Sequence, residues 1–168
     1  MIGRDYCVTM ARYNAWQNKQ LAEAIAPLDA EELTRDRGAF FGSIFRTVNH
    51  LFWGDHIWMS RFDGGSAPDC DGLEGLDAFA TVPAWRAERE RMDGRISLWA
   101  ASLEDADLAG DLTWFSGLSQ VEMTRPMATC VMQLFNHQTH HRGQIHAMIT
   151  AAGVKGYVTD LPFMPEDQ

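Results

Sequence analysis

The sequence has few cysteines and no two of them close together. Cys7, Cys70 and Cys130 form no Cys-x-x-Cys pair, so neither a disulfide framework nor a thiolate zinc site is indicated. Basic residues are also scarce: 14 lysines and arginines stand against 23 aspartates and glutamates, for a formal net charge of −9. Because a nucleic-acid surface needs clustered cations, and those of this chain are scattered among acids, we expect no nucleic-acid partner.

Long hydrophobic runs are missing as well. No run approaches the ~20 apolar residues that cross a bilayer, and the first residues do not form the apolar core of a signal peptide. We therefore expect a cytoplasmic protein without a membrane partner. With 168 residues, of which 46% are hydrophobic and 22% charged, the chain fits one globular domain spanning residues 1–168.

What the sequence does contain is helical periodicity. Apolar residues recur at spacings of three and four in segments covering about residues 5–26, 44–62, 82–103 and 127–152, which predicts four helices. Residues 112–124 alternate apolar and polar side chains around a glycine-containing turn, which predicts a small β-hairpin between the third and fourth helices. Residues 63–75 are rich in Gly, Asp and Pro and suit a long crossover loop.

The predicted fold is therefore all-α: an antiparallel four-helix bundle with a long crossover loop and a small β-hairpin. The second helix carries apolar residues on more than one side. So broad an apolar surface predicts burial by a second subunit, and hence a homodimer.

Two histidines occupy positions where the fourth helix should present apolar side chains to a core. The inward stripe of that helix runs Leu134, His137, His141, Ile145, Met148. Imidazoles at i and i+4 project from the same side of a helix, about one turn apart, and imidazole is a common ligand of zinc and nickel. The more specific hypothesis is a divalent-metal site, and the simpler one is a pair of hydrogen-bonded core histidines.

A metal site with a position open for chemistry usually has three protein ligands, so a third must come from elsewhere. The candidates are His50 and His56, both on the second helix. His50 lies in strongly apolar surroundings, where an imidazole is costly without a partner. His56 can pair with its neighbour Asp55. Residue chemistry favours His50 and leaves His56 open.

Other polar and aromatic residues are candidates for the surroundings of such a site. Asp55 can hold a ligand imidazole from outside, although a buried ion pair with Arg89 is favoured, because a buried charge demands a partner. His140 is one step off the inward stripe and is interpreted as a residue beside the site or at an interface. Gln144, one turn later, either hydrogen-bonds near the site or lies on the solvated surface. Aromatic residues at helical spacing that either line a pocket or belong to the core are Tyr13, Trp16 and Trp53.

Several segments resemble the signatures of the damage-inducible DinB family, which is unrelated to the DNA polymerase of that name. They are residues 13–18 (Tyr-Asn-Ala-Trp-Gln-Asn), 42–51 (Gly-Ser-Ile-Phe-Arg-Thr-Val-Asn-His-Leu) and 136–144, together with a tail containing Gly153, Asp160 and Phe163. The resemblance spans the chain in the right order. It implies a four-helix bundle, often a homodimer, with zinc or nickel held by His50, His137 and His141.

The resemblance also implies an activity. Characterised relatives include metal-dependent transferases and isomerases that use low-molecular-weight thiols, so a thiol-dependent S-transferase or isomerase acting on a small electrophile is the leading hypothesis. A hydrolase using metal-bound hydroxide is the enzymatic alternative. A metal-binding stress or interaction protein without turnover is the other. No residue is identified as a general base. A pocket beside the histidines favours chemistry, and a closed site favours a structural role.

Overall fold

Most of the chain is helical. The computed structural model describes residues 1–117 and 119–166. Its long helices are α1 (Arg4–Ile25), α3 (Ile44–Asp63), α4 (Val82–Ser102) and α5 (Met127–Ala151), and the short helix α2 (Ala30–Thr34) lies between the first two. Strands β1 (Asp111–Ser116) and β2 (Val121–Pro126) form an antiparallel pair, and the connections contain the 3₁₀ turns η1 (Glu74–Asp77), η2 (Asp105–Leu108) and η3 (Leu161–Phe163). The prediction of a mostly helical chain with a small hairpin is confirmed.

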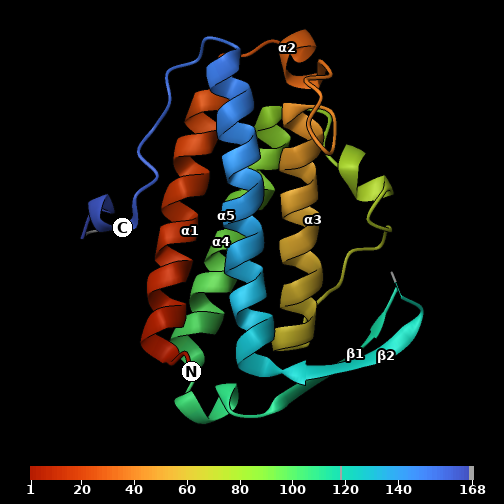
Figure 1. Cartoon of the computed structure of the whole chain (residues 1–168), viewed down its shortest axis with the longest axis vertical. Helices are drawn as coiled ribbons and strands as arrows, with labels where there is room; N and C mark the ends of the chain where they lie inside the picture. Colours follow the sequence, from red (N-terminus) through yellow and green to blue (C-terminus); the bar gives the residue numbers. More distant parts are fainter. Residues whose placement is uncertain (118, 167–168) are drawn as a thin grey trace.

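The long helices lie side by side (Figure 1). α1 packs against α4 and α5, and α3 packs against α5 and α4. α1 and α5 run in one direction, whereas α3 and α4 run in the other, so residues 64–81 must carry the chain back along the molecule before α4 begins (Figure 1). This is the crossover that the composition after Asp63 predicts. It contains η1.

The helix ends form where the local sequence signals place them. Ser43 precedes α3, and its hydroxyl accepts a hydrogen bond from the Arg46 amide at 3.2 Å. Thr81 caps α4 in the same way, with Pro83 in the first turn. Gly153 follows α5 with a φ of +83°, the left-handed conformation that glycine adopts without strain. The predicted helix boundaries therefore hold to within a residue or two.

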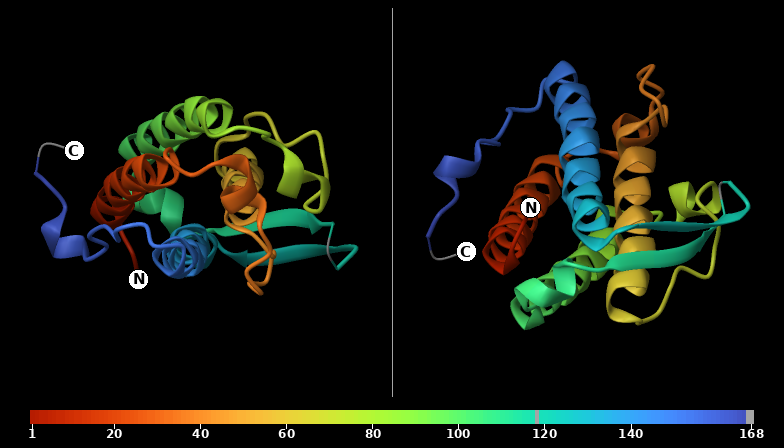
Figure 2. Two further views of the ribbon diagram at one scale, coloured as in Figure 1. Left: turned by 90° about the horizontal axis from the view of Figure 1, so that it is seen from above. Right: turned by 60° about the horizontal axis from the view of Figure 1, so that its bottom comes forward.

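The hairpin extends past α3 (Figure 2). Its register pairs Trp114 with Met123 and Leu112 with Arg125. Trp114 anchors it to the helices, because its ring lies edge-on to that of Trp58 of α3, with centroids 5.5 Å apart. The broad apolar surface of α3 is thus covered partly within the chain. The homodimer predicted from that surface stays a prediction, and its original basis is weaker.

The core consists of two apolar clusters. One is formed by the end of α1, the start of α3, the start of α4 and the end of α5, and the other by the opposite ends of the same helices. Between them, near the middle of each helix, lie buried polar side chains: Asn14, Gln17, Asn18, Asp55, Arg89, Gln138 and Arg142. Among the helices of the described residues, none combines the length and apolar character needed to span a bilayer.

Candidate metal centre

Three histidines from two neighbouring helices converge. His50 lies on α3, and His137 and His141 lie one turn apart on α5. One ring nitrogen from each lies within 4.8 Å of the others, and the Nε2 atoms of His50 and His137 are 2.9 Å apart. The structure therefore brings together the three residues that the resemblance implies as ligands. Their role as ligands stays a prediction.

His56, the alternative third ligand, has other surroundings. Its Nε2 lies 3.4 Å from the Ser66 hydroxyl in the crossover, and its ring packs near Phe52. Among the described residues, the histidines close enough together to hold one metal ion are His50, His137 and His141. The geometry therefore favours His50 over His56 as the third ligand, as residue chemistry did.

Gly54 makes room for the cluster. It lies on α3 one turn after His50, and a Cβ atom added there would be 2.7 Å from Cε1 of His137. Real Cβ atoms do not approach a ring carbon this closely, so only glycine lets the imidazole of His137 lie against α3. Sequence reasoning did not select this residue, although a glycine inside a strongly apolar helix is itself a signal of close approach.

Gln144 orients the third imidazole. Its side-chain oxygen lies 2.7 Å from Nδ1 of His141. Because an amide oxygen can only accept, Nδ1 carries the proton and Nε2 keeps its lone pair. Metal-binding histidines are typically held in this way through the nitrogen that does not bind the ion. Of the two roles open to Gln144 from sequence, contact with the site is the one that the structure shows.

The three imidazoles are favoured in their neutral form. Burial, followed by the nearby His141, lowers the pKa of His50 to about 4, and burial together with the other imidazoles lowers the pKa of His137 to about 3. Burial also lowers the pKa of His141. Nδ1 of His137 is buried without a hydrogen-bond partner. Neutral imidazoles offer the lone pairs that a divalent ion needs, so the donor set fits zinc or nickel.

The lowered pKa values predict an acid-sensitive metal-free protein. Unfolded histidines titrate near pH 6.5, whereas these stay neutral in the folded state until the pH is much lower. The unfolded state therefore binds more protons below about pH 6.5, and the free energy of unfolding should fall between about pH 7 and pH 4. Urea unfolding of chelator-treated protein should show this fall, with a shallower slope when all three histidines are replaced by glutamine. Equal slopes would contradict the assignment.

Phe41 covers the cluster from the loop between α2 and α3. Its ring centroid lies 4.0 Å from that of His50 and 5.4 Å from that of His141. The loop turns tightly, with Gly38 and Gly42 at positive φ, and Phe40 at its tip is 82% exposed. No periodic pattern pointed to Phe41, because its position depends on the fold of an irregular loop.

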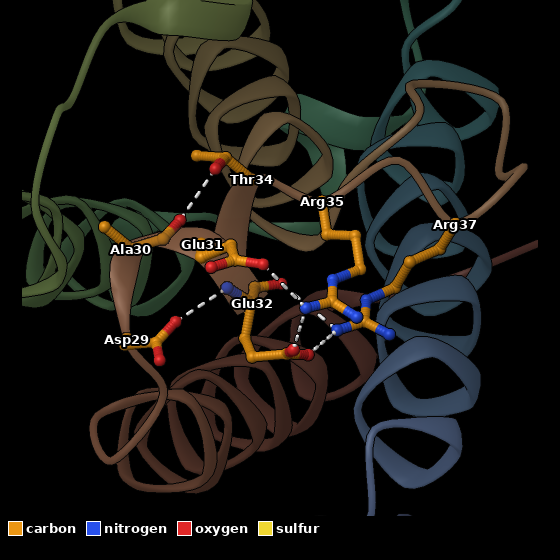
Figure 3. A network of polar contacts seen from close by, with 7 residues as sticks. All are labelled: Asp29, Ala30, Glu31, Glu32, Thr34, Arg35 and Arg37. Atoms are coloured by element: carbon orange, nitrogen blue, oxygen red, sulfur yellow. Dashed lines mark hydrogen bonds and ion pairs between the residues drawn. The ribbon is translucent and has the colours of Figure 1, made fainter.

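A network of polar contacts holds the start of this loop (Figure 3). The Asp29 carboxylate caps α2 by accepting from the Glu32 amide at 2.8 Å. Arg35 pairs with Glu31 and Glu32 at 3.0 and 2.6 Å, and Arg37 pairs with Glu32. Two arginines on the loop are thus tied to one short helix, which fixes the direction in which the loop leaves toward the histidines.

A groove lies between this loop and α5. Its volume is about 670 Å³, and Gln144, the residue that contacts His141, forms part of its wall. The other lining residues are Arg35–Phe40 of the loop and Ala147, Met148 and Ala151 of α5. The groove is of a size that accepts a small molecule, and its link to the histidines is Gln144, since the histidines themselves do not line it.

The carboxylate of Asp55 pairs with Arg89. Its Oδ2 lies 2.7 Å from Nη1 of Arg89, which is the ion pair that sequence reasoning favoured. His140 is exposed, with its ring 4.7 Å from that of His141. Asp55 thus joins α3 to α4 through Arg89 rather than holding an imidazole. His140 lies at the exposed rim of the histidine cluster.

The three aromatic candidates lie in other surroundings. The Tyr13 hydroxyl donates to the Thr159 carbonyl at 2.5 Å. Trp16 lines a hollow of about 360 Å³ between α1 and α4. Trp53 donates to the Cys70 carbonyl at 3.1 Å and so holds the crossover. Their positions give no support to a pocket wall above the histidines.

Substitution of Gly54 should weaken metal binding. Alanine at this position must displace the ring of His137, so we expect Gly54→Ala to lower zinc or nickel affinity by roughly 10- to 100-fold, as loss of a supporting contact does. Gly143 is the matched control, since it lies in α5 with nothing within 4 Å of an added Cβ.

The two glycine variants should differ in metal affinity and in stability. Gly143→Ala should keep wild-type affinity and gain about 0.5–1 kcal/mol of stability from helix propensity. Titration against a chromogenic chelator, together with urea unfolding, measures both. Equal affinities for Gly54→Ala and the wild type would show that the ring of His137 does not need this space.

The comparisons with known proteins identify the family of this chain. The chain matches the DinB family over residues 1–168. It is also similar to Protein DinB of Bacillus subtilis (strain 168), with 25% identity over 157 residues, which cover 93% of this chain and 91% of the relative. The family match includes the helices that carry the three histidines. The chain therefore belongs to the DinB family.

Proposed function

We propose that this chain is a divalent-metal-binding protein, built as an antiparallel four-helix bundle, in which His50, His137 and His141 hold zinc or nickel. The observation that carries the proposal is the convergence of three ring nitrogens within 4.8 Å. The lowered pKa values of the imidazoles and the hydrogen bond from His141 to Gln144 support it. Membership of the DinB family agrees with it.

We further propose that the site is catalytic. A divalent ion held by three imidazoles keeps a position for another ligand and lowers the pKa of a thiol or water bound there. Phe41 packs against His50, and the groove is lined in part by Gln144, which contacts His141. This arrangement suits the transfer of a low-molecular-weight thiol to a small electrophile, with the groove holding the part of the substrate that does not react.

The test is a panel of low-molecular-weight thiols with a chromogenic aryl halide, using zinc- or nickel-loaded protein without a histidine tag. We expect turnover that needs both metal and one particular thiol. It should fall at least 100-fold in His137→Ala and stay near wild type in His140→Ala, because His140 lies at the exposed rim.

Other outcomes of the panel separate the alternatives. Metal-dependent hydrolysis of esters without any thiol would replace the transferase proposal by a hydrolase. Metal-loaded protein that turns over no substrate of either class would leave a metal-binding protein without catalysis.

A further inference from the structure

The polar layer that divides the core links all four long helices. Gln138 of α5 is 0% exposed and donates to the Leu51 carbonyl of α3, the helix that also carries Asp55. Asp55 pairs with Arg89 of α4, and Arg89 pairs with Asp93 at 2.8 Å. Asp93 in turn accepts from Asn18 of α1 at 2.9 Å. The helix that carries two of the histidines is therefore part of a set of polar contacts that involves every long helix.

Gln138 has a hydrogen-bond partner on each side of its amide. Its Nε2 donates to the Leu51 carbonyl at 3.4 Å. Its Oε1 accepts from Nη1 of Arg142 at 2.9 Å, and Arg142 is itself held by the side-chain oxygen of Asn14. A buried amide satisfied on both sides has one compatible position, because any shift leaves a polar group without a partner.

The contact with Leu51 connects the three histidines to the polar layer. Gln138 directly follows His137 on α5, and Leu51 directly follows His50 on α3. The side chain of Gln138 on α5 is thus hydrogen-bonded to the backbone of α3. On each helix this contact lies one residue from a proposed ligand. Apolar contacts alone let two helices slide past each other at modest cost, whereas a buried polar contact specifies the register.

We propose that Gln138 is a positioning residue of the metal site: it sets the register of α5 against α3 so that His50 and His137 face each other. This inference rests on the proposed metal site. Glutamine is the side chain that the position requires. Leucine cannot bond to the Leu51 carbonyl, an ionised glutamate has no hydrogen to donate to it, and asparagine is one methylene too short to reach across.

The experiment uses Co²⁺ as the probe, because its visible absorption reports the number and geometry of its ligands. Wild type, Gln138→Leu and Gln138→Asn are loaded with Co²⁺, and affinity is measured by competition with a chelator. Ile149→Ala is the matched control, since Ile149 is a fully buried residue of the same helix in an apolar cluster. Urea unfolding of each metal-free protein reports its stability.

For both Gln138 variants we expect a changed Co²⁺ spectrum and an affinity lower by roughly 10- to 100-fold. Ile149→Ala should lose stability but keep the wild-type spectrum and an affinity within a few-fold of wild type. Gln138→Asn keeps an amide in the core, so it supplies the result if Gln138→Leu fails to fold.

Two results would overturn the inference, and they differ from failure of the proposed function. Wild-type spectra and affinities in the Gln138 variants would remove the positioning role, as would an equal loss of affinity in Ile149→Ala. Wild-type protein that binds neither Co²⁺ nor zinc would overturn the metal site itself, and with it any residue that positions it. Metal binding by the wild type alone decides that outcome, without any variant.

Discussion

Arg89→Met is expected to lower the free energy of unfolding by about 3–5 kcal/mol, the usual cost of removing one partner of a buried ion pair. Arg89 is 3% exposed and Asp55 is 0% exposed, with 2.7 Å between Nη1 and Oδ2. Asp93 shares the same guanidinium. Loss of the guanidinium would leave the Asp55 carboxyl group buried without its paired cation, and burial already raises its pKa.

Thermal unfolding measures this effect most simply. For a chain of this size the expected loss corresponds to a fall in Tm of roughly 6–20 °C. Arg86→Met is the control, because Arg86 pairs with Glu90 on the exposed side of the same helix, where an ion pair contributes less than about 1 kcal/mol. The double variant Arg89→Met/Asp55→Leu should recover part of the loss. Equal shifts for Arg89→Met and Arg86→Met would contradict the role of the polar layer.

His141→Ala should lower zinc affinity by roughly 100- to 1,000-fold. A structural zinc site with four ligands gains about 10–16 kcal/mol in total, and the expected loss is about a quarter of that free energy. Gln144→Ala should cost less, about 10- to 100-fold, because it frees the ring of His141 without removing a donor. His140→Ala should be close to wild type. Competition titration with a chromogenic chelator ranks the three variants. A ranking in which Gln144→Ala or His140→Ala exceeds His141→Ala would argue against the assigned ligands.

Local sequence was enough to predict the four long helices and the hairpin, although not the short helix α2. The three-and-four spacing of apolar residues is caused by burial of one helix face, and Ser43, Thr81 and Gly153 mark helix ends by chemistry that acts over a few residues. The hairpin likewise followed from alternation around a turn. These features depend on neighbours in the chain, so they can be read without knowing the packing.

The candidate site was only partly predictable from the residues themselves. The spacing of His137 and His141 places both on one face of α5, but periodicity does not fix the level at which α3 faces α5. The choice of His50 over His56 therefore leaned on residue chemistry and on the family resemblance. The structure adds two features that act at this level, the close approach at Gly54 and the amide of Gln138.

Contacts between the helices and the loops were the hardest to predict. Phe41 reaches the histidines because two glycines and the ion pairs of α2 direct its loop. Trp53 faces the crossover rather than the histidines because residues 70–75 fold back over α3. Both positions depend on contacts between segments distant in sequence, which composition and spacing do not reveal.

The central claim is that three histidines form a metal site, and metal content tests it most directly. Protein purified without a histidine tag, as wild type, His50→Ala and His56→Ala, is analysed for zinc and nickel after reconstitution and removal of free metal. We expect about one ion per chain in the wild type and in His56→Ala, and little in His50→Ala. No bound ion in the wild type, or as much in His50→Ala as in the wild type, would contradict the account.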